Sequence, residues 1–233
     1  MMLFGKEGQE HLQDATIFIA GAGGLGSPVS MYLAVLGVGT LIIADNDRVD
    51  QTNLNRQILY RDQDIGRRKA AVAGERLQEL NPDITVRAVD ATIDQNTVSS
   101  LTRDADGIVD ALDDFPTRYL LNSAALERGI PLFHGGISGF FGQATTILPG
   151  KTPCLRCIIP RPPPAEVFPV AGVTAGFIGM IQVTEVCKYL LCRGDLLAGR
   201  LLLWDGMQGR IEEIPVETDP DCEACAGKYT AIS

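Results

Sequence analysis

The chain has no block of basic residues and no long hydrophobic run. Its 233 residues include 20 Lys and Arg against 29 Asp and Glu, which gives a formal net charge of −9. An acidic chain without a basic patch is a poor ligand for nucleic acid, so no nucleic-acid partner is expected. The longest apolar stretches, Met31–Ala44 and Val170–Ile181, are short and interrupted by glycine, which excludes a membrane span and a membrane partner.

No apolar core of a signal peptide is present in Met1–Gly8. We therefore expect a cytoplasmic protein, where disulfides are rare, and the six cysteines then favour metal binding or chemistry. The composition, 45% apolar and 21% charged, is that of a globular chain. Its length fits one α/β domain with an appendage.

Short apolar runs alternate with stretches of helical periodicity as far as about residue 135. Strands that alternate with helices pair in parallel, which predicts an α/β, Rossmann-like, doubly wound and mostly parallel sheet. The expected strands are Thr16–Ala20, Leu41–Ala44, Thr85–Val89, Gly107–Leu112 and one beginning at Pro131–His134. The expected helices run from Gly26 to about Gly37, over Ile65–Leu80 and over Tyr119–Arg128.

The second half of the chain has a different pattern. A C-terminal antiparallel strand region is expected, with strands at Gly142–Leu148, Arg200–Trp204 and Arg210–Pro215. Ala175–Leu191 reads as an apolar helix whose glycines allow close packing. Arg161–Pro169 holds four prolines, which predicts an extended or mobile loop.

A glycine loop, Gly21-Ala22-Gly23-Gly24-Leu25-Gly26, lies between the first strand and the first long helix. Glycines bring backbone N–H groups close to phosphate, and the helix N-terminus adds a partial positive charge. Asp45 follows the next strand, where it can accept hydrogen bonds from ribose hydroxyls. This motif alone indicates a nucleotide. It would also fit a nicotinamide or flavin dehydrogenase, or a tight turn without a ligand.

The segment from Asp45 to Gln57 is more polar than a dehydrogenase needs at this place. Asn53 and Arg56 lie three residues apart, so one helical turn would place them on one face, directed at the phosphates. Lys69 can supply a second cation.

These features together resemble the MoeB/ThiF/HesA family, the bacterial and archaeal relatives of ubiquitin-activating enzymes. The resemblance covers the chain from about Leu3 to Gly227. The motifs that carry it are the glycine loop, Asp45-x-Asp47, Asn53–Gln57, Gly66-x-x-Lys69, Asp110–Asp114, Cys154-x-x-Cys157, Ala171–Val173, Glu185-x-x-Lys188 and Cys222-x-x-Cys225.

The resemblance implies an adenylyltransferase. In such a reaction, the C-terminal Gly-Gly carboxylate of a ubiquitin-like sulfur-carrier protein (MoaD or ThiS type) attacks the α-phosphate of ATP and pyrophosphate leaves. Molybdopterin or thiamine biosynthesis is the expected setting. A homodimer is expected, as is one adenylation domain over 1–233, with a nucleotide-binding half at 1–135 and a zinc-bearing, partner-binding half at 136–233.

The resemblance also assigns roles to single residues. Arg56, Lys69 and Asp113 are the expected catalytic residues, the first two on phosphate oxygens and the third on Mg²⁺. Asn53 would position the α-phosphate. The full nucleotide-binding set is Gly21, Gly23, Gly24, Gly26, Asp45, Asp47, Asn53, Arg56, Gln57, Lys69, Asp113 and Asp114. Taken singly, Arg56 could be a surface ion pair, Lys69 a solvated lysine and Asp113 a helix cap.

Two cysteine pairs, Cys154-x-x-Cys157 and Cys222-x-x-Cys225, are expected to form a structural zinc site of four thiolates. Two unrelated reduced pairs or a redox C-x-x-C motif are the alternatives. Cys187 and Cys192 lie on or near the apolar helix and are expected to act as small buried hydrophobes, with sulfur transfer as the alternative.

The chain also departs from the family. Phe168 stands where many relatives carry a cysteine, so a covalent thioester or persulfide step there is not supported. An upstream Arg-Tyr-x-Arg-Gln stretch is not present before Phe4, and Asp114 replaces the asparagine of many relatives. Two further readings therefore stay open: a nicotinamide-dependent oxidoreductase, and a family member that binds nucleotide and a partner without turnover.

Overall fold

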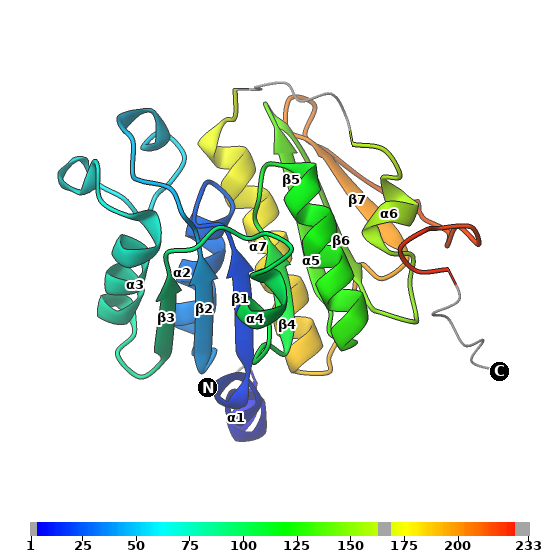
Figure 1. Ribbon diagram of the computed structural model, residues 1–233, viewed down its shortest axis with the longest axis horizontal. Coiled ribbons are helices and arrows are strands. Elements are labelled where there is room, and N and C mark those ends of the chain that lie inside the picture. Colours follow the sequence, from blue (N-terminus) through cyan, green and yellow to red (C-terminus); the bar gives the residue numbers. More distant parts are fainter. Residues whose placement is uncertain (1–3, 163–168, 227–233) are drawn as a thin grey trace.

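One eight-stranded sheet runs through the protein, for which a computed structural model describes residues 4–162 and 169–226 (Figure 1). The strand order is β3-β2-β1-β4-β5-β6-β7-β8, with parallel pairing from β3 to β5 and antiparallel pairing from β5 to β8. The strands are β1 Thr16–Ala20, β2 Thr40–Ala44, β3 Thr85–Val89, β4 Gly107–Asp110, β5 Leu132–Ser138, β6 Phe141–Ile147, β7 Arg200–Asp205 and β8 Arg210–Pro215.

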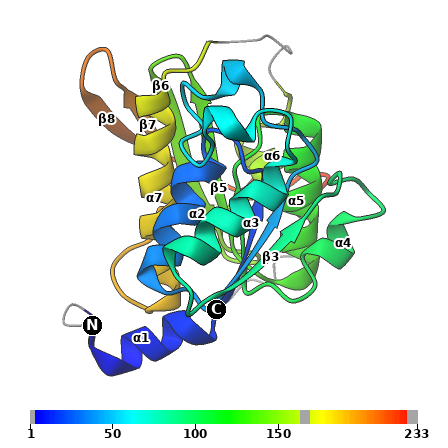
Figure 2. The ribbon, with the colours of Figure 1, turned by 90° about the vertical axis from the view of Figure 1, so that its left-hand side faces the viewer.

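Helices cover both faces of this sheet, as Figure 2 shows in side view. One face carries α2 Gly26–Leu36, α3 Lys69–Leu80 and α7 Gly172–Leu190, and α1 Gly5–Asp14 contacts α7 at the lower end. The opposite face carries α4 Val98–Leu101, α5 Phe115–Arg128 and α6 Leu155–Ile158. Two 3₁₀ turns, η1 Gln51–Asn53 and η2 Asp62–Asp64, lie between β2 and α3.

The two faces contain two apolar cores, and β1 contributes to both because successive side chains point to opposite sides of a strand. Ile17 and Ile19 are fully buried in the core under α2, α3 and α7. Phe18 and Ala20 are fully buried in the core under α5. A strand that is buried on both faces reads as a continuous apolar run, which is why Thr16–Ala20 was recognisable.

The predicted doubly wound, mostly parallel α/β fold with an antiparallel C-terminal region is confirmed. Two helix starts differ from the prediction by four residues. The predicted helix over Ile65–Leu80 begins only at Lys69, because Gly66 has φ +84° and Arg68 is extended. In contrast, α5 begins at Phe115, four residues before the prediction.

Several smaller boundaries also differ. The strand predicted over Gly107–Leu112 ends at Asp110, and α7 begins at Gly172 instead of Ala175. Helices α1, α4 and α6 were not predicted. Most of the proline-rich Arg161–Pro169 loop, residues 163–168, lies outside the described residues. No helix in the described ranges is long and apolar enough to cross a bilayer.

Candidate active site

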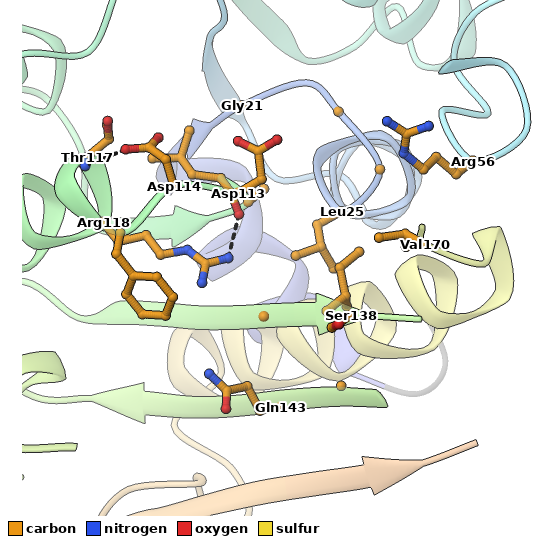
Figure 3. A pocket seen from close by; sticks show the side chains of 18 of the residues that line it. Gly21, Leu25, Arg56, Asp113, Asp114, Thr117, Arg118, Ser138, Gln143 and Val170 are labelled. Atoms are coloured by element: carbon orange, nitrogen blue, oxygen red, sulfur yellow. Dashed lines mark hydrogen bonds between the residues drawn. The ribbon is translucent and has the colours of Figure 1, made fainter. Parts of the chain in front are cut away.

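A cavity of about 1560 Å³ opens at the carboxyl ends of the parallel strands. Its wall includes the glycine loop after β1, the acidic segment after β2, the start of α5 after β4, and the β5–β6 and β7–β8 hairpins (Figure 3). The chain leaves β1 toward β2 and leaves β4 toward β5, in opposite directions. In open α/β sheets, ligands bind in the crevice formed at such a switch point.

The glycine loop is packed so closely that two of its glycines admit no side chain. A Cβ on Gly26 would lie 2.0 Å from the carbonyl oxygen of Gly21, and one on Gly21 would lie 2.9 Å from that of Ala111. Gly21 also has φ +94°. The first turn of α2 has no side-chain cap. The N–H groups of Ser27 and Val29 already donate to the carbonyls of Gly23 and Leu25, so the end of α2 offers an anion the N–H of Gly26 and the positive end of the helix dipole.

Asp45 is held at the carboxyl end of β2 by the loop that it faces. Its Oδ2 accepts a hydrogen bond from the N–H of Ala22 at 2.8 Å, and its Oδ1 accepts one from the N–H of Asp47 at 2.8 Å. Each carboxylate oxygen can accept a second hydrogen bond. Asp45 is therefore oriented by the glycine loop and retains capacity for ribose hydroxyls.

Two of the predicted cations line the cavity, and neither is a freely solvated side chain. Lys69 is 5% exposed, and its Nζ lies 2.8 Å from Oδ2 of Asp47, whose side chain is 65% exposed. Arg56 donates through one terminal nitrogen to the carbonyl of Thr52 and to Oδ1 of Asn55, both at 3.0 Å. Its aliphatic stem lies over Gly24, where a Cβ would meet Cγ of Arg56 at 3.7 Å.

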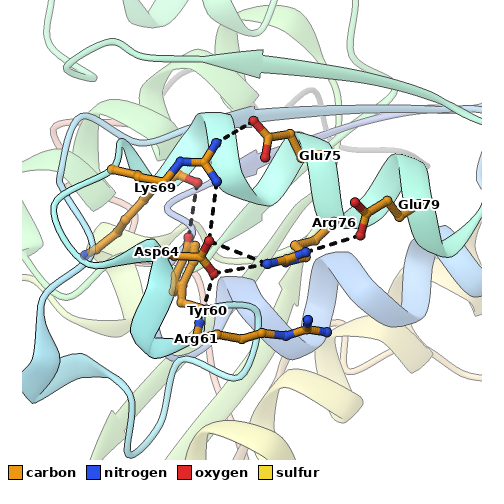
Figure 4. Close-up of polar contacts among 8 residues, drawn as sticks. Tyr60, Arg61, Asp64, Lys69, Glu75, Arg76 and Glu79 are labelled. Atoms are coloured by element: carbon orange, nitrogen blue, oxygen red, sulfur yellow. Dashed lines mark hydrogen bonds and ion pairs between the residues drawn. The ribbon is translucent and has the colours of Figure 1, made fainter.

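A buried carboxylate, Asp64, holds the segment that carries these cations (Figure 4). Asp64 is fully buried, accepts a hydrogen bond from the N–H of Arg61, and forms ion pairs with Arg67 and Arg76. The hydrogen bond from Arg76 to Asp64 raises the pKa of the Arg76 guanidinium. Asp64 thereby joins the loop after β2 to α3.

Tyr60 connects the same segment to the glycine loop. Its buried hydroxyl donates to the carbonyl of Ala22 at 2.8 Å and lies 3.4 Å from the carbonyl oxygen of Lys69. Burial, together with the nearby carboxylates Asp45, Asp47 and Asp64, raises the pKa of Tyr60, which stays protonated and acts as a donor. Tyr60 therefore links the glycine loop to the backbone at Lys69.

Gln57 and Asn53 have different placements. Gln57 lines the cavity and is 4% exposed, and its Oε1 has no hydrogen-bond partner among the described residues. Asn53 is not among the lining residues. Its carbonyl accepts the N–H groups of Arg56 and Gln57, so it shapes the turn that presents both side chains.

The two aspartates after β4 line the cavity and are exposed. Asp114 caps α5, because its Oδ1 accepts a hydrogen bond from the N–H of Thr117 at 2.8 Å. The helix cap that the sequence suggested for Asp113 is thus made by Asp114. The carboxylate of Asp113 takes no part in this cap.

Arg118 and Gln143 are two of the cavity-lining residues that sequence reasoning missed. Arg118 is 5% exposed, donates to the carbonyls of Leu112 and Gly135, and lies against the ring of Phe115. Its position one turn into α5, four residues after Asp114, was a signal that could have been used. Gln143 is on β6, and nothing in the sequence marks it.

The four paired cysteines form one cluster, in which all four Sγ atoms lie within 4.8 Å of one another. Cys154 and Cys222 are 3.7 Å apart at sulfur, and Cys157 and Cys225 are 3.4 Å apart. A zinc ion with four thiolates at about 2.3 Å requires S···S separations of about 3.8 Å. The cluster therefore fits a structural zinc ion, and none of its cysteines lines the cavity.

The remaining predicted residues have different outcomes. Cys187 on α7 is partly buried, and burial raises its pKa to about 11. The expectation that Cys192 is buried is wrong, because it is exposed just beyond the end of α7 with φ +50°. Phe168 lies outside the described residues.

Glu185, from the family motif, is buried and accepts hydrogen bonds from Thr146 and from the N–H of Leu197, so it joins α7 to the antiparallel strands.

Comparison with known proteins decides the family. The ThiF family matches residues 1–224. The chain belongs to this family. It is 45% identical over 227 residues to the SAMP-activating enzyme E1 of Haloferax volcanii, covering 95% of this chain and 84% of that protein. It is 41% identical over 237 residues to the sulfur carrier protein adenylyltransferase of Thermus thermophilus, covering 97% and 88%.

Solved structures agree on the fold of this ThiF-family chain. The crystal structure of E. coli MccB with ATP superimposes with a TM-score of 0.80 at 24% identity, covering 94% of this chain and 68% of that one. Family membership, and not the glycine loop, decides against a nicotinamide-dependent dehydrogenase.

Proposed function

We propose that this chain is an adenylyltransferase that uses ATP to activate the C-terminal carboxylate of a ubiquitin-like sulfur-carrier protein. The observation that carries this conclusion is the single cavity that joins the glycine loop, Arg56, Lys69 and Asp113 to the antiparallel β5–β8 region. A nucleotide site that shares one cavity with the antiparallel strands suits two substrates whose reacting groups must meet.

The reaction joins two anions, so charge neutralisation and alignment matter more than a protein nucleophile. One carboxylate oxygen of the partner attacks the α-phosphorus, the bond to the bridging oxygen breaks, and pyrophosphate leaves with that electron pair. Arg56 and Lys69 hold the phosphate oxygens, the α2 N-terminus supports the triphosphate, and Asp45 holds the ribose. The amide nitrogen Nε2 of Gln57 lies beside Gly23, where a Cβ would meet it at 3.7 Å, so Gln57 can donate to a phosphate oxygen there.

Asp113 and Asp114 are suited to Mg²⁺, which binds carboxylate oxygens and keeps several waters. Both side chains are exposed at the cavity wall, and the cap on α5 uses one oxygen of Asp114. When bound, Mg²⁺ withdraws charge from the phosphates. The four-cysteine cluster would hold Zn²⁺ in a structural role, remote from the reacting atoms.

We assign the partner and assembly by analogy with the relatives. The partner is a ubiquitin-like protein with a C-terminal Gly-Gly, of the kind that molybdopterin and thiamine biosynthesis use, and the enzyme acts in the cytoplasm. It works as a homodimer, with one adenylation domain over 1–233 whose halves, 1–135 and 136–233, bind the nucleotide and the partner. Size measurement at micromolar concentration tests the dimer, and a monomer there would remove it.

ATP–pyrophosphate exchange with Mg²⁺ and a panel of ubiquitin-like proteins ending in Gly-Gly tests the reaction. We expect exchange that requires one partner and is lost in Arg56→Ala. Tight binding of ATP without exchange for any partner would instead identify a family member that binds without turnover. A stronger thermal shift with NAD⁺ than with ATP and Mg²⁺ would contradict the assignment altogether.

A further inference from the structure

A buried polar chain of three residues runs from the end of β4, across β5, to the part of the cavity floor formed by β6. Asp110 at the end of β4 and His134 on β5 are register partners in the parallel sheet, 0% and 1% exposed. His134 Nδ1 lies 2.7 Å from Oδ2 of Asp110, and His134 Nε2 lies 3.2 Å from Nε2 of Gln143. The nucleotide chemistry described above uses none of these three residues.

The direction of each hydrogen bond in the series Asp110–His134–Gln143 follows from the groups at its two ends. The Asp110 carboxylate accepts, so Nδ1 of His134 carries the proton and donates. Burial lowers the pKa of His134, which keeps the ring neutral despite the opposing effect of Asp110. A neutral ring protonated at Nδ1 has a lone pair at Nε2, and Gln143 must therefore donate its amide N–H there. Its Oε1 is left as a free acceptor.

Asp110 itself contacts three other residues that hold it in place. Nε of Arg118 lies 3.6 Å from its Oδ1, and the N–H of Leu112 donates to the same oxygen at 3.2 Å. Nε2 of Gln182 on α7 donates to the backbone carbonyl of Asp110. An arrangement with this many fixed partners defines one orientation for the imidazole ring, and through the ring one orientation for the Gln143 amide.

Gly136 provides the space for this arrangement. Gly136 and Gln143 are register partners in the β5–β6 pair, and a Cβ on Gly136 would lie 3.1 Å from both Cγ and Nε2 of Gln143. The side chain of Gln143 therefore lies flat across the backbone of β5 and lines the cavity floor. No hydrogen bond to its Oε1 occurs within residues 4–162 and 169–226.

From its position, Gln143 would contact the acyl substrate and not the nucleotide. Three strand spacings of about 4.8 Å separate β1, with its glycine loop, from β6. Figure 3 shows Gln143 beyond β5, on the side away from Asp113 and Asp114. An extended peptide that enters along the antiparallel strands would cross this floor before it reaches the nucleotide, and its main chain offers N–H donors.

We propose that Oε1 of Gln143 accepts a hydrogen bond from the last peptide N–H of the incoming C-terminal segment, and that His134 with Asp110 acts as the positioning device that presents this oxygen. The inference rests on the proposed adenylation. It assigns a substrate contact to Gln143 and a positioning role to His134.

Two synthetic probes test the contact without turnover. Glycylglycyl-sulfamoyladenosine imitates the adenylate and carries the peptide N–H, and its ester analogue replaces that N–H with oxygen. By calorimetry we expect the wild-type protein to bind the amide about threefold to tenfold more tightly than the ester, as one hydrogen bond implies. Gln143→Met should bind both probes equally, and Gln13→Met, on α1 far from the cavity, should retain the preference.

The outcomes separate the two proposals. If neither probe binds, the adenylation proposal fails and this inference fails with it. If both bind tightly to the wild type without any preference, adenylation stands and the Gln143 contact is overturned. A preference that survives in Gln143→Met likewise overturns the contact.

The positioning role has its own readout, since the chain contains only two histidines. Nitrogen-15 NMR should show His134 protonated at Nδ1 and not at Nε2, whatever the activity. His134→Asn retains a donor near Asp110 but removes Nε2, so this variant should lose the preference for the amide probe. His134→Gln places a side-chain group near the position of Nε2, so this variant should keep the preference. The double variant His134→Asn/Gln143→Met should bind the probes like Gln143→Met alone. Additive losses, or protonation at Nε2, would overturn the positioning role.

Discussion

Lys69 shows how a buried charge can be kept available for a ligand. Its ammonium is nearly enclosed, but its one carboxylate partner, Asp47, is mostly in solvent. Removing an ion from water costs several kcal/mol, which a pair with an exposed partner offsets only in part. A triphosphate placed in the cavity would complete the compensation.

Lys69→Met should therefore separate activity from stability. We expect pyrophosphate exchange to fall by about 100-fold to 1000-fold, because a cation on the reacting phosphates is lost. The melting temperature should stay the same or rise, since an apolar side chain replaces a buried charge and Asp47 remains solvated. Lys6→Met, at an exposed lysine of α1, should change neither quantity. A loss of exchange in step with a fall in melting temperature would contradict this account.

The two cysteines outside the metal cluster should differ in reactivity. Cys192 is exposed, whereas burial raises the pKa of Cys187 to about 11, so at pH 8 only about 0.1% of Cys187 is thiolate. Iodoacetamide at pH 8 should modify Cys192 well before Cys187, as read by peptide mass mapping. Cys192→Ser should remove the fast phase. Rapid labelling of Cys187 would show that α7 is less tightly packed than in this structure.

The sequence predicts some secondary-structure elements better than others. The β1–loop–α2 unit was predictable because its causes are local: an apolar strand, glycines that allow no side chain, and Gly37 with φ +82° at the end of α2. The start of α3 was not predictable, because it depends on Gly66 in a left-handed conformation and on long-range ion pairs to Asp64.

The site followed the same division between local and long-range causes. Asp45, Arg56, Lys69 and Asp113 lie in motifs that the sequence displays, and the structure brings them to one cavity. The Asp110–His134–Gln143 chain arises from strand register between β4, β5 and β6, which sequence spacing does not reveal. Cys192 was misplaced although the predicted helix end, Leu191, is one residue from the observed end, because the pattern gives no information on the left-handed residue that follows, Cys192 with φ +50°.

The segment between β2 and α3 should depend on Asp64 as a single point of attachment. Asp64→Ala removes the acceptor for Arg61, Arg67 and Arg76 together and leaves buried donors without partners. We expect the melting temperature to fall by about 5–10 °C and ATP binding to weaken, because this segment carries Arg56 and Lys69. Calorimetry measures both.

The matched control for Asp64 is Glu79→Ala, which removes an exposed carboxylate that also pairs with Arg76. Exposed pairs contribute little, so its melting temperature should stay within about 2 °C of the wild type. Equal effects of the two substitutions would show that Asp64 does not organise this segment.

The molecule as a whole consists of one sheet with two kinds of pairing, and the cavity spans the change between them. The parallel strands supply the glycine loop and the acidic groups, and the antiparallel strands supply the remaining wall. The cysteine cluster lies on the side of α5 and α6, and Ile159 and Arg161, just after α6, line the cavity. Zinc can therefore affect the outer part of the cavity without touching the nucleotide part.

Removal of zinc should separate partner binding from ATP binding. Cys222→Ser breaks the link between the C-terminal segment and α6, and should remove the one zinc ion per chain, measured by elemental analysis, and lower the melting temperature by about 10 °C. At temperatures where the variant stays folded, the KM for the partner protein should rise while the Kd for ATP changes less than twofold. Cys192→Ser should leave all four quantities unchanged. Equal weakening of partner and ATP would mean that the cluster supports the whole sheet and not only its outer end.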